Sequence, residues 1–149
     1  VSAFLLNRSS DLEMGENDMI EQGFHIGNRD WWVMAYYDVR TPEDLRKIEG
    51  TLMASGCPDR SIAEAISNLK GWNRGYTFSN YRAHTSIMVM SKATSPEQMF
   101  DTIVHEMKHL AEHIGEFYGV DSTSELSAYL QGEVGRKMWP AAAMALCSR

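Results

Sequence analysis

Long apolar and aromatic runs mark the expected strands of this chain. Residues 31–39 read Trp-Trp-Val-Met-Ala-Tyr-Tyr-Asp-Val, and this enrichment in aromatic and β-branched residues predicts a buried strand. Residues 76–82 and 85–91 have a similar composition on either side of a short turn, and they are expected to pair as a hairpin. The pattern therefore predicts a small sheet.

Apolar side chains that recur every three or four residues predict four helices. Thr41 and Ser95 are each followed by a proline and by acidic or amide residues, which is typical of a capped helix N-terminus. Gly56 is expected to end the first helix, and Pro140 is expected to end the last one. The four helices are expected over residues 41–55, 58–70, 95 to either 115 or 119, and 122–138.

The order of strand, two helices, hairpin and two further helices predicts an α+β domain, with a small antiparallel or mixed sheet packed on helices. A chain of 149 residues has the usual size of one domain, which is expected to cover residues 31–149. Residues 1–30 are polar, acidic and dotted with glycine, so an N-terminal arm that is partly disordered is expected there. The alternatives are an ordered arm or a short helix over residues 12–20.

Charge and cysteine content narrow the classes of function. The net charge of −6 gives the chain no overall basic excess of the kind that nucleic-acid binders and anionic-lipid binders use, so neither partner is expected. Cys57 and Cys147 lie far apart without a CxxC pair, which predicts free thiols in a reducing compartment and hence a cytoplasmic protein. No apolar run approaches the roughly 20 residues that span a bilayer.

Residues 105–109 read His-Glu-Met-Lys-His, the H-E-x-x-H pattern, in the middle of the third expected helix. Residues four apart lie one turn apart on the same helix face, so His105 and His109 can bind one metal ion. Glu106 lies between them and the core face, where it reaches a metal-bound water without being a ligand. Nitrogen and oxygen donors on this motif favour Zn²⁺. The alternative without a metal is a pair of solvated histidines.

A catalytic zinc site needs a third protein ligand and an open position for water. Glu125 is the first candidate, because a helical hairpin can bring the start of the last helix back to the metal. It also fits a capping box with Ser122, in which its side chain only bonds the backbone. Asp121 and Glu133 are weaker alternatives. His113 lies about 12 Å beyond the first motif histidine on a straight helix, so a surface histidine is expected there.

The histidine motif, followed by Glu-Leu-Ser-Ala-Tyr-Leu at residues 125–130, resembles the gluzincin branch of the zincin-like metallopeptidases, in particular small bacterial and phage members. The second segment is similar to the E-x-x-A-Y segment that supplies their glutamate ligand. The resemblance implies a minimal zincin-like domain with the metal motif on the penultimate helix. It also implies that His105, His109 and Glu125 bind zinc and that Glu106 is the general base.

In that family a sheet edge strand before the metal helix binds the peptide substrate, and residues 85–91 are expected to be the matching strand. Tyr129 lies one turn after Glu125, where it is expected to orient a ligand, to stabilise an oxyanion or to pack in the core. The predicted function is a zinc metallopeptidase, in which metal-activated water attacks a peptide bond and Glu106 takes its proton. The alternative is a non-catalytic zinc-binding domain with a structural or regulatory role.

Overall fold

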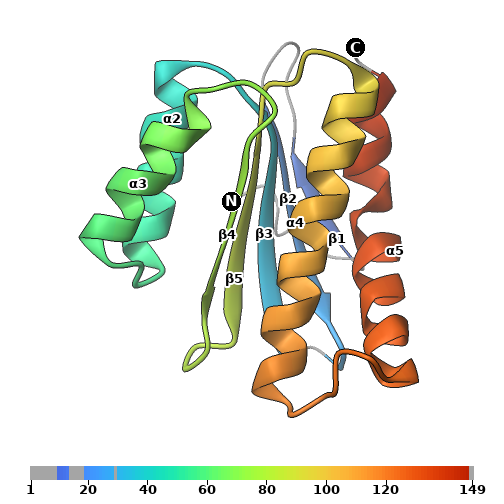
Figure 1. Ribbon diagram of the computed structural model, residues 1–149. Coiled ribbons are helices and arrows are strands. Elements are labelled where there is room, and N and C mark those ends of the chain that lie inside the picture. Colours follow the sequence, from blue (N-terminus) through green and yellow to red (C-terminus); the bar gives the residue numbers. More distant parts are fainter. Residues whose placement is uncertain (1–9, 14–18, 29, 148–149) are drawn as a thin grey trace.

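A computed structural model describes residues 10–13, 19–28 and 30–147 of the chain (Figure 1). In this part of the chain, two helices cover each face of one five-stranded sheet, so the fold is α+β. The strands are β1 (Ser10–Glu13), β2 (Ile20–Ile26), β3 (Trp31–Val39), β4 (Gly75–Asn80) and β5 (Thr85–Ser91). The helices are α2 (Pro42–Ala54), α3 (Asp59–Leu69), α4 (Pro96–Phe117) and α5 (Glu125–Cys147).

The sheet has the strand order β1-β2-β3-β5-β4, and only the β3–β5 pair is parallel. The predicted hairpin of β4 and β5 is confirmed. However, the expectation that residues 85–91 form an edge strand is wrong. Because β5 pairs with β3 on one side and with β4 on the other, it has no free edge for a peptide. The free edge on this side of the sheet belongs to β4.

Helices α2 and α3 lie on one face of the sheet, and α4 and α5 lie on the other (Figure 1). Each face has its own apolar core. The predicted cap of α2 is confirmed, because the Thr41 side chain accepts a hydrogen bond from the backbone N–H of Asp44, whose side chain bonds back. No helix within residues 10–13, 19–28 and 30–147 has the length and apolar character needed to cross a membrane.

Strand β2 corrects the expected domain boundary at residue 31. It pairs with β3 along its whole length, and Phe24 is fully buried between the sheet and the helices. Two residues, Gln22 and Gly23, interrupt the apolar pattern of this strand, so the sequence did not indicate it. Gln22 is buried, where it accepts from the Tyr37 hydroxyl and donates to a backbone carbonyl of α5. Gly23 leaves room for Trp32, because a Cβ at this position would lie 2.5 Å from the indole ring.

The N-terminal helix expected over residues 12–20 is absent where the structure describes this range. Residues 12 and 13 belong to β1 and residue 20 begins β2, whereas residues 14–18 lie outside the described part of the chain. Residues 1–9 of the arm expected over residues 1–30 also lie outside it. The ordered domain therefore includes two strands that the polar composition of this region did not indicate.

Helix α5 continues nine residues beyond its expected end and passes through Pro140 to Cys147. An interior proline removes one backbone hydrogen bond and costs about 3 kcal/mol. Here, the residues after it are mostly alanine, the strongest helix former. Ala141, Ala142 and Ala145 are buried against the sheet, and their packing offsets the loss at the exposed proline. The prediction that Pro140 ends the helix is therefore wrong.

Candidate metal centre

Helix α4 carries residues 105–109 near its middle and begins as expected. Ser95 accepts a hydrogen bond from the backbone N–H of Gln98 at 3.1 Å, and Pro96 occupies the first turn. The helix packs on the sheet between the β4 edge and α5 (Figure 1). Its side chains therefore divide into one flank that faces β4 and another that faces α5.

The imidazoles of His105 and His109 converge on the surface of α4. Their Nε2 atoms are 3.2 Å apart, and their ring centroids are 4.8 Å apart. Two zinc–nitrogen bonds of ordinary length at a tetrahedral angle place the two nitrogens about 3.3 Å apart. Both side chains are exposed, so an ion can reach them from solvent. The pair thus has the separation that two ligands of one zinc ion require.

Glu112 lies near Nδ1 of His109, the ring nitrogen that does not face His105. Its Oε1 is 3.7 Å from Nδ1 of His109, and its Oε2 accepts from Lys108 at 3.0 Å. A carboxylate on the outer nitrogen of a metal-binding histidine is a common partner that fixes the ring orientation. The lysine within the motif points to solvent and pairs with this carboxylate.

The side chain of Glu106 is buried between α4 and β4, and only 3% of the residue's surface is exposed. The Thr77 hydroxyl on β4 donates a 2.7 Å hydrogen bond to its Oε1. Gly75, two residues earlier on the same strand, leaves the space that this carboxylate fills, because a Cβ there would lie 2.5 Å from Oε2. The motif glutamate is therefore seated on the edge strand by a hydroxyl donor and a glycine.

His113 also faces β4. Its Nδ1 lies 2.7 Å from the hydroxyl of Ser79, which in turn lies 2.7 Å from the hydroxyl of Ser86. The indole N–H of Trp31 donates to the hydroxyl of Ser86 at 2.9 Å. A series of hydrogen bonds therefore runs from α4 across strands β4, β5 and β3. Burial, and secondarily the nearby imidazole of His109, hold the pKa of His113 below its usual value. The expected hydrogen-bonded histidine is thus half-buried against the edge strand.

Glu125 lies far from the histidine pair. The helices α4 and α5 run antiparallel, with Gly115 packed on Leu130 and Met107 packed on Gly135. This register places Glu125 beyond the level of Gly115, at least about 10 Å along the helix axis from His109. Moreover, the histidines project on the β4 flank of α4, since about 100° of rotation separates successive residues.

The other candidates for a third ligand have different partners. Asp121 accepts from both the backbone N–H and the hydroxyl of Thr123, and these bonds hold its pKa below the usual value. Glu133 accepts from the backbone N–H of Gly27. Among the described residues, no group of three or more His, Cys, Asp or Glu side chains is placed to hold a metal.

The expected capping role of Ser122 and the expected core packing of Tyr129 are wrong. The Ser124 hydroxyl accepts from the backbone N–H of Ser127, so Ser124, rather than Ser122, caps the start of α5. Tyr129 is 69% exposed, so it does not pack in the core, and its expected role beside a ligand or an oxyanion stays a prediction. The structure therefore brings the imidazoles of His105 and His109 together, seats the carboxylate of Glu106 against β4, and leaves Glu125 apart from the histidine pair.

Three residues of β4 that hold this site were not singled out from the sequence. Gly75, Thr77 and Ser79 alternate with the larger Tyr76 and Phe78 along the strand. The small residues face α4, whereas Tyr76 and Phe78 pack with the core beneath α2 and α3. This period of two, with small polar residues on one face, is the signal that could have indicated a close approach of a helix.

Comparison with protein families, curated protein sequences and solved structures gives no significant match. The fold and the site together define an α+β domain that carries a convergent histidine pair and a buried glutamate beside the free edge of its sheet.

Proposed function

We propose that this protein binds Zn²⁺ through His105 and His109 and hydrolyses peptide bonds with Glu106 as the general base. The observation that carries the proposal is the 3.2 Å separation of the two Nε2 atoms, which matches that of two ligands on one zinc ion. The neighbouring Glu106 is an acidic group on the same stretch of helix, held by a specific donor. The resemblance to gluzincins assigns the same roles to these three residues.

The residues of the chain have distinct tasks in this proposal. Bound zinc supplies Lewis acidity and lowers the pKa of water near neutrality. The hydrogen bond from Thr77 holds the carboxylate of Glu106 in its ionised, proton-accepting form beside the motif helix, as a general base requires. The free edge of β4 offers backbone groups to an extended peptide beside these side chains.

The two imidazoles fit a zinc ion, but the described residues do not complete the coordination. A zinc ion held by two histidines needs at least one further donor. Glu125 supplies it only if the start of α5 moves toward the β4 flank of α4. The proposal therefore depends on His105 and His109 and keeps Glu125 as a ligand to be tested.

A non-catalytic zinc-binding domain is the second candidate, and the burial of Glu106 favours it. The carboxylate is seated against β4, whereas the imidazoles stand in solvent. In that case, the zinc has a structural or regulatory role, and the glutamate stabilises the contact between α4 and the edge strand.

Metal analysis of protein purified without a histidine tag tests both candidates. We expect one zinc ion per chain, lost in the double variant His105→Asn/His109→Asn and kept in the control His84→Asn. Absence of zinc from the parent protein after incubation with zinc would overturn both candidates. A peptide-library assay then separates them. Cleavage that disappears in Glu106→Gln while zinc is retained indicates the peptidase, whereas stoichiometric zinc without cleavage indicates the non-catalytic domain.

Glu125→Gln, measured beside Glu133→Gln, tests the third ligand. Zinc affinity that falls at least about tenfold only in Glu125→Gln would show that α5 moves to complete the site. Equal affinity in both variants would show that the described arrangement, with Glu125 remote, is the metal-binding one.

A further inference from the structure

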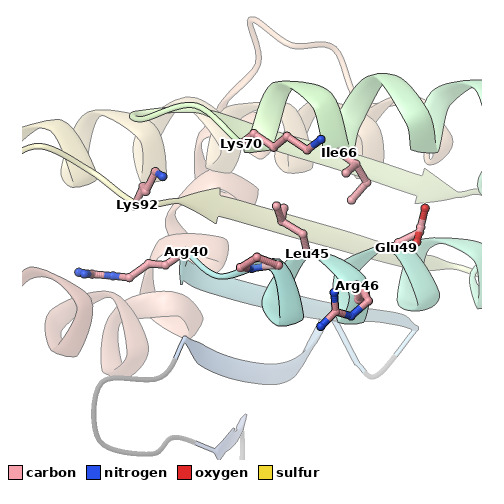
Figure 2. A pocket seen from close by; sticks show the side chains of 8 residues that line it. Arg40, Leu45, Arg46, Glu49, Ile66, Lys70 and Lys92 are labelled. Atoms are coloured by element: carbon pink, nitrogen blue, oxygen red, sulfur yellow. The ribbon is translucent and has the colours of Figure 1, made fainter.

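A cavity of about 460 Å³ lies between α2 and α3, on the face of the sheet opposite α4 (Figure 2). It is located where the parallel strands β3 and β5 end, because Arg40 follows β3 and Lys92 follows β5. The carboxyl ends of parallel strands are a frequent position for ligand sites. The volume is in the usual range for a small-molecule pocket.

Four cationic side chains and one carboxylate line this cavity, although the whole chain carries a net charge of −6. The cations come from separate segments: Arg40, Arg46, Lys70 and Lys92. Arg40 pairs with Asp38 at 3.0 Å. In the part of the chain that the structure describes, the other three cations have no carboxylate within ion-pair distance. Four of the 14 lysine and arginine residues of this acidic protein therefore line one hollow.

The backbone positions of these cations are fixed by the fold. Lys92 donates its N–H to the carbonyl of Val39 and accepts from the N–H of Asn73, so it is bonded to two other segments. Its ammonium lies 4.9 Å from the centre of the Trp72 ring. Lys70 is the C-cap residue of α3. A ligand anion thus meets cations whose backbones are already ordered, which reduces the entropy cost of binding.

The floor of the cavity is apolar. Figure 2 shows Leu45 of α2 and Ile66 of α3 between the two helices, with the ends of Lys70 and Lys92 on the α3 side of the hollow. Pro42 adds a further apolar surface. The first turn of α2 contributes no strong anion site of its own, because Thr41 and Asp44 already cap it. The charged side chains and the apolar floor therefore determine what can bind.

We propose that this cavity binds a small phosphate monoester, with the phosphate on the side chains of Lys70 and Lys92 and the organic part on Leu45 and Ile66. A dianionic phosphate accepts hydrogen bonds from several cationic donors, and Figure 2 shows the ends of Lys70 and Lys92 on the same side of the hollow, whereas the ends of Arg40 and Arg46 point away from it. The single carboxylate of the lining, Glu49, opposes such a ligand. The site is separate from the histidine pair, so this proposal does not depend on zinc.

Phenyl phosphate, inorganic phosphate and phenol are the probes that test the two parts of the site. Binding is followed by calorimetry and by Trp72 fluorescence, which responds to a ligand beside Lys92, with Trp72→Phe to identify the signal. We expect phenyl phosphate to bind at least about fivefold more tightly than inorganic phosphate, because only the ester covers the apolar floor. Phenol is expected to show no saturable binding.

Charge variants locate the anion. Lys70→Gln and Lys92→Gln should each weaken phenyl phosphate binding about three- to fivefold, and Glu49→Gln should strengthen it about twofold. The matched control is Arg60→Gln, which makes the same change in charge on the exposed surface of α3, outside the cavity. An equal loss of affinity for phenyl phosphate in Arg60→Gln would show that only the net charge of the protein matters, and this result would overturn the site. Absence of binding would also overturn it, and equal affinity for inorganic phosphate would overturn the ester.

Discussion

The two flanks of α4 differ in the residues that they bring together. On the β4 flank, Glu106 and His113 form polar contacts with the edge strand, and the histidine pair stands beside them in solvent. On the α5 flank, Met107 and Gly115 pack against apolar or small residues of the neighbouring helix. One flank has the groups that can bind metal and move protons, and the other stabilises the position of the helix.

This difference explains why two neighbouring helices in the chain do not share a site. A helix hairpin brings α5 beside α4 throughout its length, but it brings it to the flank opposite the histidines. The hydrogen-bond partners of Glu106 and His113 come instead from β4, which precedes α4 in the chain by one strand. The difference predicts that substitutions on the two flanks affect stability and zinc binding separately.

The largest effect is expected from Met138→Ala on α5. Met138 is almost fully buried in the core under α4 and α5, so its truncation should lower the free energy of unfolding by about 2–5 kcal/mol. Chemical denaturation measures this loss. Met53→Ala, at an exposed position of α2, is the matched control and should change stability little. Zinc affinity of the folded Met138→Ala protein should equal that of the parent; a large fall would show that α5 takes part in the site.

Gly75→Ala should lower stability by about 1–3 kcal/mol, because the new methyl group collides with the buried carboxylate of Glu106. The same substitution at Gly50, inside α2, meets no neighbour and should stabilise the protein by about 0.5–1 kcal/mol. A double-mutant cycle with Glu106→Ala sharpens the test. The cost of Gly75→Ala should shrink when the carboxylate is absent. An unchanged cost would place the strain elsewhere on β4.

Thr77→Val should cost about 1–2 kcal/mol, since it keeps the shape of the side chain but removes the donor to the carboxylate of Glu106. Thr85→Val on the adjacent strand removes a hydroxyl that only bonds a local carbonyl, so its effect on the free energy of unfolding should be smaller. Equal losses in the two variants would mean that the buried hydrogen bond contributes no more than an exposed one.

Much of the fold could be predicted because the local pattern and the packed structure agree. The aromatic run of β3, the capped starts of α2 and α4, and the hairpin of β4 and β5 are confirmed within a few residues. β2 was missed because Gln22 and Gly23 interrupt its apolar alternation, although each has a specific buried partner. The end of α5 was misplaced because burial of the residues beyond Pro140 outweighs the local effect of proline.

The candidate site could be predicted only as far as one helix determines it. The spacing of His105 and His109 is a property of α4, and the structure places their nitrogens close together. The position of Glu125 depends instead on the side of α4 on which the hairpin returns, which no local pattern specifies. The same is true of Thr77 and Ser79, whose role follows from the order of the strands in the sheet.

The smallest predicted effect on the β4 flank is a pH dependence that arises from His113. Its pKa in the folded state is lowered by burial first and by His109 second, whereas in the unfolded state it returns to about 6.5. The unfolded chain therefore binds the proton more tightly, and the contribution of neutral His113 is complete above about pH 6.5. It is lost as the pH falls from there through the lower, folded-state pKa.

Denaturation in the presence of a chelator, between pH 7 and pH 5, should show a smaller loss of stability in His113→Gln than in the parent. Ser79→Ala should leave the titration in place but lower stability by about 1 kcal/mol at pH 7, because the Nδ1 contact is removed. If His113→Gln lost as much stability on acidification as the parent, the half-buried imidazole would make no contribution to the pH dependence, and the polar contacts of this flank would stabilise the fold without making it sensitive to pH.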